Sequence, residues 1–403
     1  MFPAVYKVSN VLLFAALPVA LTVVILAGGF VKGPFLYDFK GGLYGAGHDI
    51  VHGQNPYRAA YLERQAALKR AGHAPQTVIS VPVYPAPALV AAVPFSLLPY
   101  GLAAVLFSLV SAGALVGGLW LVNVRDWRCY GIAFMSWPVI HGLMLGAMTP
   151  LLVLGTAATW RYRDRLRPPA AAVASVIVAK LFLWPLAVWL LVTRRTRAFA
   201  LAVALGATAT LGAWAAIGFA GFTDYPRMLS DLSFVSEDVG VSPVAGFIAL
   251  GLPASAARAG ALALAALVLC AAWRLSRRPD GARRAFGLAV VAALVASPMV
   301  WPHYFALLFV PIALASPGLS PLWFVPLLAY LAPDAQTTGR QWAIALYLAI
   351  AAVPLLRLFS SRPLPPDDPK GHIASKRIPR PARGRTVDGF VPRVSNAENV
   401  RLS

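Results

Sequence analysis

"VLLFAALPVALTVVILAGGFVKGPFLYDF", residues 11 to 39, decides the fold class of this chain. Residues 11 to 30 form an apolar run of about 20 residues, which is the length of one helix across a membrane. No clear cleavage site follows the run, so we interpret it as a retained first transmembrane helix and not as a signal peptide. Asp38 stands just after this helix, although the chain keeps its acids out of its apolar runs.

The composition extends this interpretation to most of the chain. Of 403 residues, 59% are hydrophobic and only 12% are charged, which excludes an ordinary soluble globular domain. We therefore predict an all-α polytopic membrane protein with a bundle of about 11 to 13 transmembrane helices. The later apolar runs are residues 83–99, 100–122, 129–160, 168–192, 198–220, 256–273, 285–300, 303–316, 320–333 and 341–357.

The basic residues indicate the orientation of these helices. Lysine and arginine outnumber aspartate and glutamate by 35 to 15, but the excess is concentrated in a few loops and in the tail. Such loops face the cytoplasm in membrane proteins, so the pattern does not predict nucleic-acid binding. The N-terminus is then cytoplasmic, and Asp38 and the acidic segment 222–240 lie on the outer face. The segments predicted to be cytoplasmic are 161–167, 193–197, 274–284 and the tail from Arg357.

Residues 1–358 are expected to form one membrane-embedded domain. Within it, residues 31–82 form a polar outer loop, and helical spacing at 41–53 and 57–71 predicts two short amphipathic helices on the outer membrane surface. The basic residues of these helices either contact lipid headgroups or have a functional role, and the sequence leaves both open. The rest of the chain, residues 359–403, is rich in proline and arginine and is predicted to be a disordered, basic cytoplasmic tail that meets anionic membrane lipids.

Two regions of the bundle have distinctive patterns. Residues 83–99 and 100–122 predict a hairpin that crosses the membrane inward and returns outward, with its turn at Pro99 to Gly101. Residues 129–160 are interrupted by Gly146 and Pro150. This second region is either one span with a re-entrant piece or a region that includes two short half-helices.

The apolar run at 168–192 contains a lysine and has a basic loop on each side. A single span would place one of these loops outside, against the positive-inside rule. Two short helices with their apex near Lys180 would keep both loops inside and bring Lys180 toward the outer face. Because a lysine is costly in lipid, we expect Lys180 to face protein or a wet cavity, and we favour a functional role over snorkelling.

Several motifs then occur in a recognisable order. They are "YDF" (37–39), "GQNPY" (53–57), "VYPAPALVAAVPFSLLP" (83–99), "AKLFLWPLAVWLLVTRR" (179–195) and "ASPMVWPHYF" (296–305). Together they resemble the integral-membrane glycosyltransferases of GT-C type, specifically glycosyltransferase family 87, over about residues 8 to 357. This family includes polyprenyl-phosphate-mannose-dependent α-mannosyltransferases. The chain departs from the family pattern at Gly146-Ala147, where Gly-Gln is common, and at "VSP" (241–243), where Asn-Gln-Ser is expected.

The resemblance implies a GT-C-like fold and an inverting, single-displacement sugar transfer on the outer face. The donor implied is a polyprenyl-phosphate sugar, with mannose as the expected sugar, and the acceptor is a lipid or a glycan. Asp38 is implied as the general base, because a carboxylate at the membrane edge can accept the proton of the acceptor hydroxyl. In the competing interpretation, Asp38 caps the next helix. No cofactor or metal ion is expected, since the sequence contains no Asp-x-Asp motif.

Other side chains are candidates for the donor and the sugar. The departing lipid phosphate gathers negative charge, so fixed cationic donors should stabilise it. The candidates for this role are Lys180, His303 and, more weakly, Arg58, although His303 could equally be a packing histidine. The candidates that line the sugar or acceptor cavity are the aromatic residues Tyr57, Tyr84, Trp301 and Tyr304, which could also be membrane-interface residues.

Two other functions remain open from the sequence. A lipid or solute transporter or flippase also uses broken helices with buried charge, but it would show paired repeats, which we do not find. Another GT-C enzyme, such as a glycan ligase, also uses lipid-linked sugars. Such enzymes depend on a large outer loop late in the chain, whereas the long outer segment here comes first.

Overall fold

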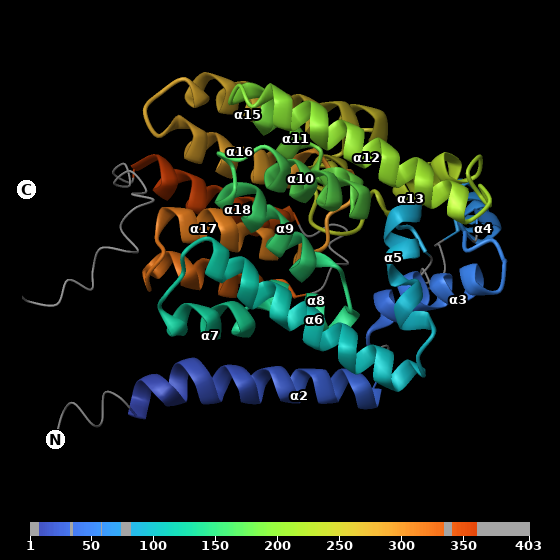
Figure 1. Cartoon of the computed structure of the whole chain (residues 1–403), viewed down its shortest axis with the longest axis horizontal. Helices are drawn as coiled ribbons and strands as arrows, with labels where there is room; N and C mark the ends of the chain where they lie inside the picture. Colours follow the sequence, from blue (N-terminus) through green and yellow to red (C-terminus); the bar gives the residue numbers. More distant parts are fainter. Residues whose placement is uncertain (1–7, 33–34, 58, 74–81, 334–340, 361–403) are drawn as a thin grey trace, which may run out of the picture. The chain divides into compact units, whose positions relative to one another are not determined.

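The computed structural model describes residues 8–32, 35–57, 59–73, 82–333 and 341–360, and all regular elements in these ranges are helices (Figure 1). Arg58, Arg340 and the tail 361–403 lie outside the described residues. Among the described residues, four helices are long and apolar enough to cross a membrane: α6 (Tyr100–Leu121), α12 (Thr196–Ala216), α15 (Ala254–Ser276) and α18 (Gln341–Ser360). The all-α membrane prediction is thus confirmed, and the total of about 11 to 13 spans stays a prediction.

The remaining apolar segments form shorter or broken helices, many of which contain proline near the first turn or at a break. Proline lacks an N–H and restricts the residue before it, so it starts new helices where a continuous span would otherwise run. These elements are α2 (Leu17–Lys32), preceded by the π-helical turn η1 (Leu12–Ala16), then α7 (Trp127–Met135), α8 (Trp137–Leu145), α9 (Thr149–Arg161), α16 (Gly281–Ala296), η4 (Pro302–Leu308), α17 (Phe309–Ala315) and η5 (Pro321–Leu331).

Three of the basic loops meet at one end of the bundle, which we call the basic end. The Arg195 side chain donates hydrogen bonds to the Arg163 carbonyl at 2.8 Å and to Asp164 at 2.9 Å. The Ser276 hydroxyl donates to the Val192 carbonyl at 3.1 Å. The loops at 161–167, 193–197 and 274–284 therefore lie on the same side of the bundle, as the charge pattern predicts.

The segment that contains Lys180 begins and ends at the basic end. Helix α10 (Arg167–Ala179) stops at Lys180, whose backbone is extended (φ −149°, ψ 109°), and the chain continues through η3 (Leu181–Leu183) into α11 (Pro185–Val192). Because the contacts of Arg195 join the two flanking loops, Lys180 stands at the apex of a helical hairpin. The predicted pair of short helices is thus confirmed.

The opposite end of the bundle, which we call the Asp38 end, carries the short surface helices. These are the π-helical turn η2 (Asp38–Tyr44), α3 (Gly45–Val51), α4 (Ala59–Arg70), α13 (Tyr225–Ser236) and α14 (Pro243–Ala249). Two helical segments are therefore present where the amphipathic helices were expected. In α4, Lys69 binds Asp238 at 2.8 Å and Arg70 binds Asp231 at 3.0 Å, while contact of these helices with headgroups stays a prediction. The acidic segment is thus the partner of this helix.

The predicted hairpin at residues 83–122 is wrong in its first half. Helix α5 (Ala86–Ser96) has 11 residues, about 16 Å, and runs across the direction of the long helices in Figure 1. Both of its ends contact the same outer segment. The Tyr57 hydroxyl donates to the Tyr84 carbonyl at 3.2 Å before the helix, and the Ser96 hydroxyl donates to the Tyr44 carbonyl at 2.8 Å at its end.

Helix α6 therefore starts at the Asp38 end and leads to the basic end. Near its start, Tyr44 donates a hydrogen bond to the Leu98 carbonyl at 2.9 Å. After its end, Asp126 accepts from the Leu319 backbone at 3.3 Å, and the neighbouring Leu314 carbonyl accepts from the buried Arg283 at 3.0 Å. The sequence placed residues 122–126 on the outer face, and these contacts place them at the basic end.

The region 129–160 forms three short helices, with a tight turn between α8 and α9. Gly146 has φ +68°, and a Cβ atom at this position would lie 2.7 Å from the Cβ of Phe39. The Leu36 backbone also donates to the Met144 carbonyl at 2.8 Å. This turn is therefore held against the segment that carries Asp38, and the glycine permits the close approach.

The two ends give a direct test of orientation. In a chain with Cys270→Ser, we expect Ala67→Cys on α4 to react with an impermeant thiol reagent added to intact cells. Thr196→Cys at the basic end should react only after the membrane is opened, because the positive-inside rule places that end in the cytoplasm. Both positions are exposed. Labelling of the second variant and not of the first would reverse the orientation.

Candidate active site

The candidate active site is centred on Lys180, whose side chain is held by two tyrosines. Its Nζ donates a hydrogen bond to the Tyr304 hydroxyl at 2.5 Å and lies over the Tyr304 ring, 4.5 Å from the centroid. It also lies 5.0 Å from the centroid of the Tyr84 ring. Phe182 stacks on Tyr304 with the rings 4.9 Å apart and nearly parallel. The ammonium group is therefore fixed by hydrogen bonding and by cation–π contacts.

Asp38 lies in the electrostatic field of this lysine. It is half-buried and begins η2, two residues after Leu36, which has a positive φ of 53°. Burial raises the pKa of the Asp38 carboxyl to about 6, and the Lys180 ammonium opposes this rise. Asp38 makes no hydrogen bond as a helix cap in the described structure, because the cap position of η2 is Tyr37 and has no side-chain bond. The capping interpretation of Asp38 is thus wrong.

Tyr84 connects Asp38 with the adjacent helices. Its ring is buried, and its pKa is raised well above the usual range, first by burial and then by the charge of Asp38. The Met148 backbone forms a hydrogen bond with Tyr84, so the α8–α9 turn contributes to its position. One carboxylate, one ammonium and two phenols thus come together from four separate parts of the chain.

Tyr57 contacts the backbone of Tyr84. Its ring stacks on Trp214 at 5.3 Å, it contacts Tyr225 at 5.1 Å, and its hydroxyl donates to the Tyr84 carbonyl. The Tyr57 side chain is buried, with only 4% of its surface exposed. Its contacts are those of a residue that positions Tyr84.

His303 lies beside Tyr304 and is almost completely buried, with 2% of its surface exposed. Its ring packs edge-on against Tyr304 at 4.7 Å and contacts His141 at 5.4 Å. Neither of its ring nitrogens has a hydrogen-bond partner among the described residues. His303 therefore contacts Tyr304, the hydrogen-bond partner of Lys180. Its own ring nitrogens are free to bind a ligand, because no described residue forms a hydrogen bond with them.

Sequence reasoning missed His141. Its ring stacks on Trp137 at 5.2 Å and meets His303, so it extends the aromatic wall behind Tyr304. The available signal was the four-residue spacing of Trp137 and His141, which places both side chains on one face of α8.

The other predicted site residues are less closely connected with Asp38. Trp301 is half-buried against the hydrophobic core of the bundle. Arg58 falls outside the described residues, so its role in phosphate binding stays a prediction. Within the described ranges no group of three or more His, Cys, Asp or Glu side chains could hold a metal ion.

A comparison with known families gives one match. A family model described as glycosyltransferase family 87 matches residues 83–298, more than half of the chain. The chain belongs to glycosyltransferase family 87. It is therefore a membrane glycosyltransferase, which uses a sugar donor and an acceptor. No curated protein and no solved structure matches this family 87 chain.

The matched residues of this family 87 glycosyltransferase contain Tyr84 and Lys180. Asp38 and Tyr304 lie outside the matched range, one before it and one after it. They are connected with the matched part by the electrostatic influence of Lys180 on Asp38 and by the hydrogen bond of Lys180 to Tyr304.

Proposed function

We propose that this family 87 glycosyltransferase moves a sugar, mannose, from a polyprenyl-phosphate donor to a lipid or glycan acceptor on the outer face of the membrane. The observation that carries the proposal is the placement of the Asp38 carboxylate near the fixed ammonium of Lys180. A transfer from a lipid phosphate needs a base on the acceptor side and a cation on the phosphate side. These two side chains supply one of each.

The proposed reaction is a single displacement. The Asp38 carboxylate accepts the proton of the acceptor hydroxyl as the hydroxyl oxygen attacks the anomeric carbon. The bond between this carbon and the phosphate oxygen breaks, and its electron pair leaves with the polyprenyl phosphate. Lys180 stabilises the developing negative charge, and Tyr304 holds Lys180 in place. Attack opposite the leaving phosphate inverts the anomeric centre.

The environment of Asp38 supports its role as the base. Burial raises the pKa of Asp38 to about 6, so the group is a stronger base than an exposed aspartate and is still ionised near neutral pH. A general base works best with a pKa near the operating pH. The opposing effect of Lys180 on this pKa keeps the carboxylate charged in a half-buried position.

The pH dependence of transfer should follow the pKa of Asp38. Because only the ionised carboxylate accepts a proton, kcat/KM should fall about tenfold per pH unit below roughly pH 6. In Lys180→Met the residual activity should show this fall at a higher pH, since the ammonium that lowers the Asp38 pKa is removed. The measurement is kcat/KM of the purified protein in lipid from pH 4.5 to 8. An unchanged midpoint in the variant would show that Lys180 does not influence the pKa of Asp38.

The donor is tested directly with purified full-length protein in lipid vesicles. The protein is given a panel of polyprenyl-phosphate sugars and nucleotide sugars with candidate lipid and glycan acceptors, and the products are analysed for linkage and anomeric configuration. We expect transfer from polyprenyl-phosphate mannose with inversion. Transfer from a nucleotide sugar alone, or with retention of configuration, would contradict the proposal.

A further inference from the structure

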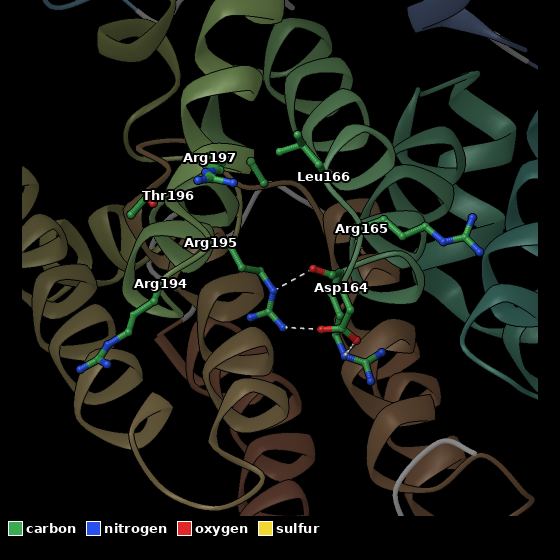
Figure 2. Close-up of a pocket in the computed structure, with 9 residues that line it drawn as sticks. Asp164, Arg165, Leu166, Arg194, Arg195, Thr196 and Arg197 are labelled. Carbon is green, nitrogen blue, oxygen red and sulfur yellow. Dashed lines mark hydrogen bonds and ion pairs between the residues drawn. The ribbon is translucent and has the colours of Figure 1, made fainter. Parts of the chain in front are cut away.

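A polar cavity lies at the basic end, separated from the candidate active site by the length of the helices. It has a volume of about 510 Å³ and is formed by the loops before α10 and α12 (Figure 2). Its lining contains Arg163, Asp164, Arg165, Leu166, Arg194, Arg195, Thr196, Arg197 and Ala198. Five arginines and one aspartate therefore surround a space large enough for a small ligand or a headgroup.

The inner part of this cavity is fixed. Arg195 bridges the two loops by its bonds to the Arg163 carbonyl and to Asp164 (Figure 2). The guanidinium of Arg163 lies 4.3 Å from the Trp160 ring centroid, and that of Arg195 lies 5.2 Å from the Trp189 ring centroid. Asp164 is the only acid in the lining, and ion pairs with Arg163 and Arg195 balance its charge.

The outer part carries positive charge without a carboxylate partner in the described structure. Arg165, Arg194 and Arg197 are exposed and form no ion pair among the described residues. Figure 2 shows Arg197 close to the opening, while the side chains of Arg165 and Arg194 extend away from it on opposite sides. The three arginines therefore add positive charge at the opening and on both sides of it.

The backbone adds to this positive field. Helix α12 begins at Thr196 and α10 begins at Arg167, both at the edge of the cavity, and neither has a side-chain hydrogen bond at its N-cap. The first N–H groups of a helix and its dipole attract anions. The contribution of α12 is the larger, because Pro168 and Pro169 remove two donors from the first turn of α10.

We propose that this cavity binds a phosphate-ester anion, from the headgroup of an anionic phospholipid or from a soluble phosphate compound. Guanidinium groups match phosphate oxygens in geometry and charge. Basic pockets between membrane helices on the cytoplasmic side bind anionic lipid headgroups. Leu166, which is 47% exposed at the rim, offers an apolar contact to the chain of such a lipid. The site is distinct from the one that contains Asp38 and takes no part in sugar transfer.

The test uses the purified full chain in detergent and three probes: phosphatidylglycerol, phosphatidylcholine and inorganic phosphate. Binding is followed by native mass spectrometry and by the midpoint of thermal unfolding. The variant carries Arg165→Gln, Arg194→Gln and Arg197→Gln. The matched control carries Arg274→Gln, Arg277→Gln and Arg278→Gln, which removes the same charge from exposed residues of the same end that are outside the cavity.

We expect phosphatidylglycerol to bind the wild-type chain, and the cavity variant to weaken this binding about tenfold or more, with a change of less than about twofold in the control. Competition by inorganic phosphate would identify a soluble phosphate as the source, and its absence would identify the lipid. Three results would overturn the proposal. They are equal weakening in both triple variants, wild-type binding in the cavity variant, and no binding of any probe to the wild-type chain. If the triple variant does not fold, the three single variants are compared in the same assay, where wild-type binding in all three would likewise overturn it.

Discussion

Asp38→Asn should abolish sugar transfer while the protein still folds and enters the membrane. The amide has nearly the shape of the carboxylate but cannot accept the proton of an acceptor hydroxyl. General-base catalysis contributes about a hundredfold to ten-thousandfold to a rate, so the turnover should fall by that factor. The measurement is the initial rate of transfer by purified protein in lipid, with its thermal unfolding midpoint as the check on folding.

Asp49→Asn is the matched control for this prediction. Asp49 lies in α3 of the same outer segment, and the substitution removes the same charge about three helical turns from Asp38. Its rate should stay close to that of the wild-type chain. Near-normal transfer by Asp38→Asn, or equal losses in both variants, would remove Asp38 as the base.

Lys180→Ala should lower the rate of transfer by about a hundredfold to a thousandfold, which corresponds to the loss of about 2.7 to 4 kcal/mol of transition-state stabilisation. The ammonium is expected to act as the phosphate departs, so kcat should fall more than donor binding weakens. His303→Ala should also lower kcat, because His303 packs against the tyrosine that holds Lys180. The measurements are kcat, KM and the donor dissociation constant for each variant.

Lys40→Ala provides the comparison for a cation that lies elsewhere at the Asp38 end. Lys40 is exposed and lies over the Tyr100 ring at 5.3 Å, so its removal should cost little rate. Tyr304→Phe should give an intermediate loss, because it removes the hydroxyl that binds Lys180 and keeps the ring. Full activity of Lys180→Ala would move the search for the phosphate site to Arg58, Lys40 and Arg340.

The sequence was most informative where charge and hydrophobicity act together. The break at Lys180 was predictable because two basic loops flank one apolar run, and both loops must lie on the same side. Asp38 was noticeable because it follows a long apolar run directly. In each case the membrane strongly penalises the alternative, so the pattern alone indicated the arrangement.

Hydrophobicity alone gave the wrong result for α5. Residues 83–99 are as apolar as a transmembrane helix, but the helix starts only after Pro85 and ends at Ser96. Its apolar side chains pack within the protein, since Leu89 is fully buried and Ala88 nearly so. A sequence does not distinguish apolar residues that face lipid from those that pack against other helices.

Contacts between distant residues were also beyond the sequence. Tyr304 was predicted only as a residue that lines the cavity, and its hydrogen bond to Lys180 spans 124 positions of the chain. The ion pairs of α4 with the acidic segment join positions that are still farther apart in sequence, 169 and 161 residues. Such pairs depend on how the helices fold together, which a local pattern does not contain.

The helical hairpin at Lys180 has a consequence for how the protein is made. Helices α10 and α11 have 13 and 8 residues, and each is too short to span a membrane of about 20 residues by itself. We therefore expect the pair to leave the insertion machinery as one unit. Its lysine gains its hydrogen-bond partner only when Tyr304 is synthesised and inserted. The candidate active site is thus complete only after Tyr304, 124 positions beyond Lys180, has been inserted, whereas Asp38 and Tyr84 precede the lysine in the chain.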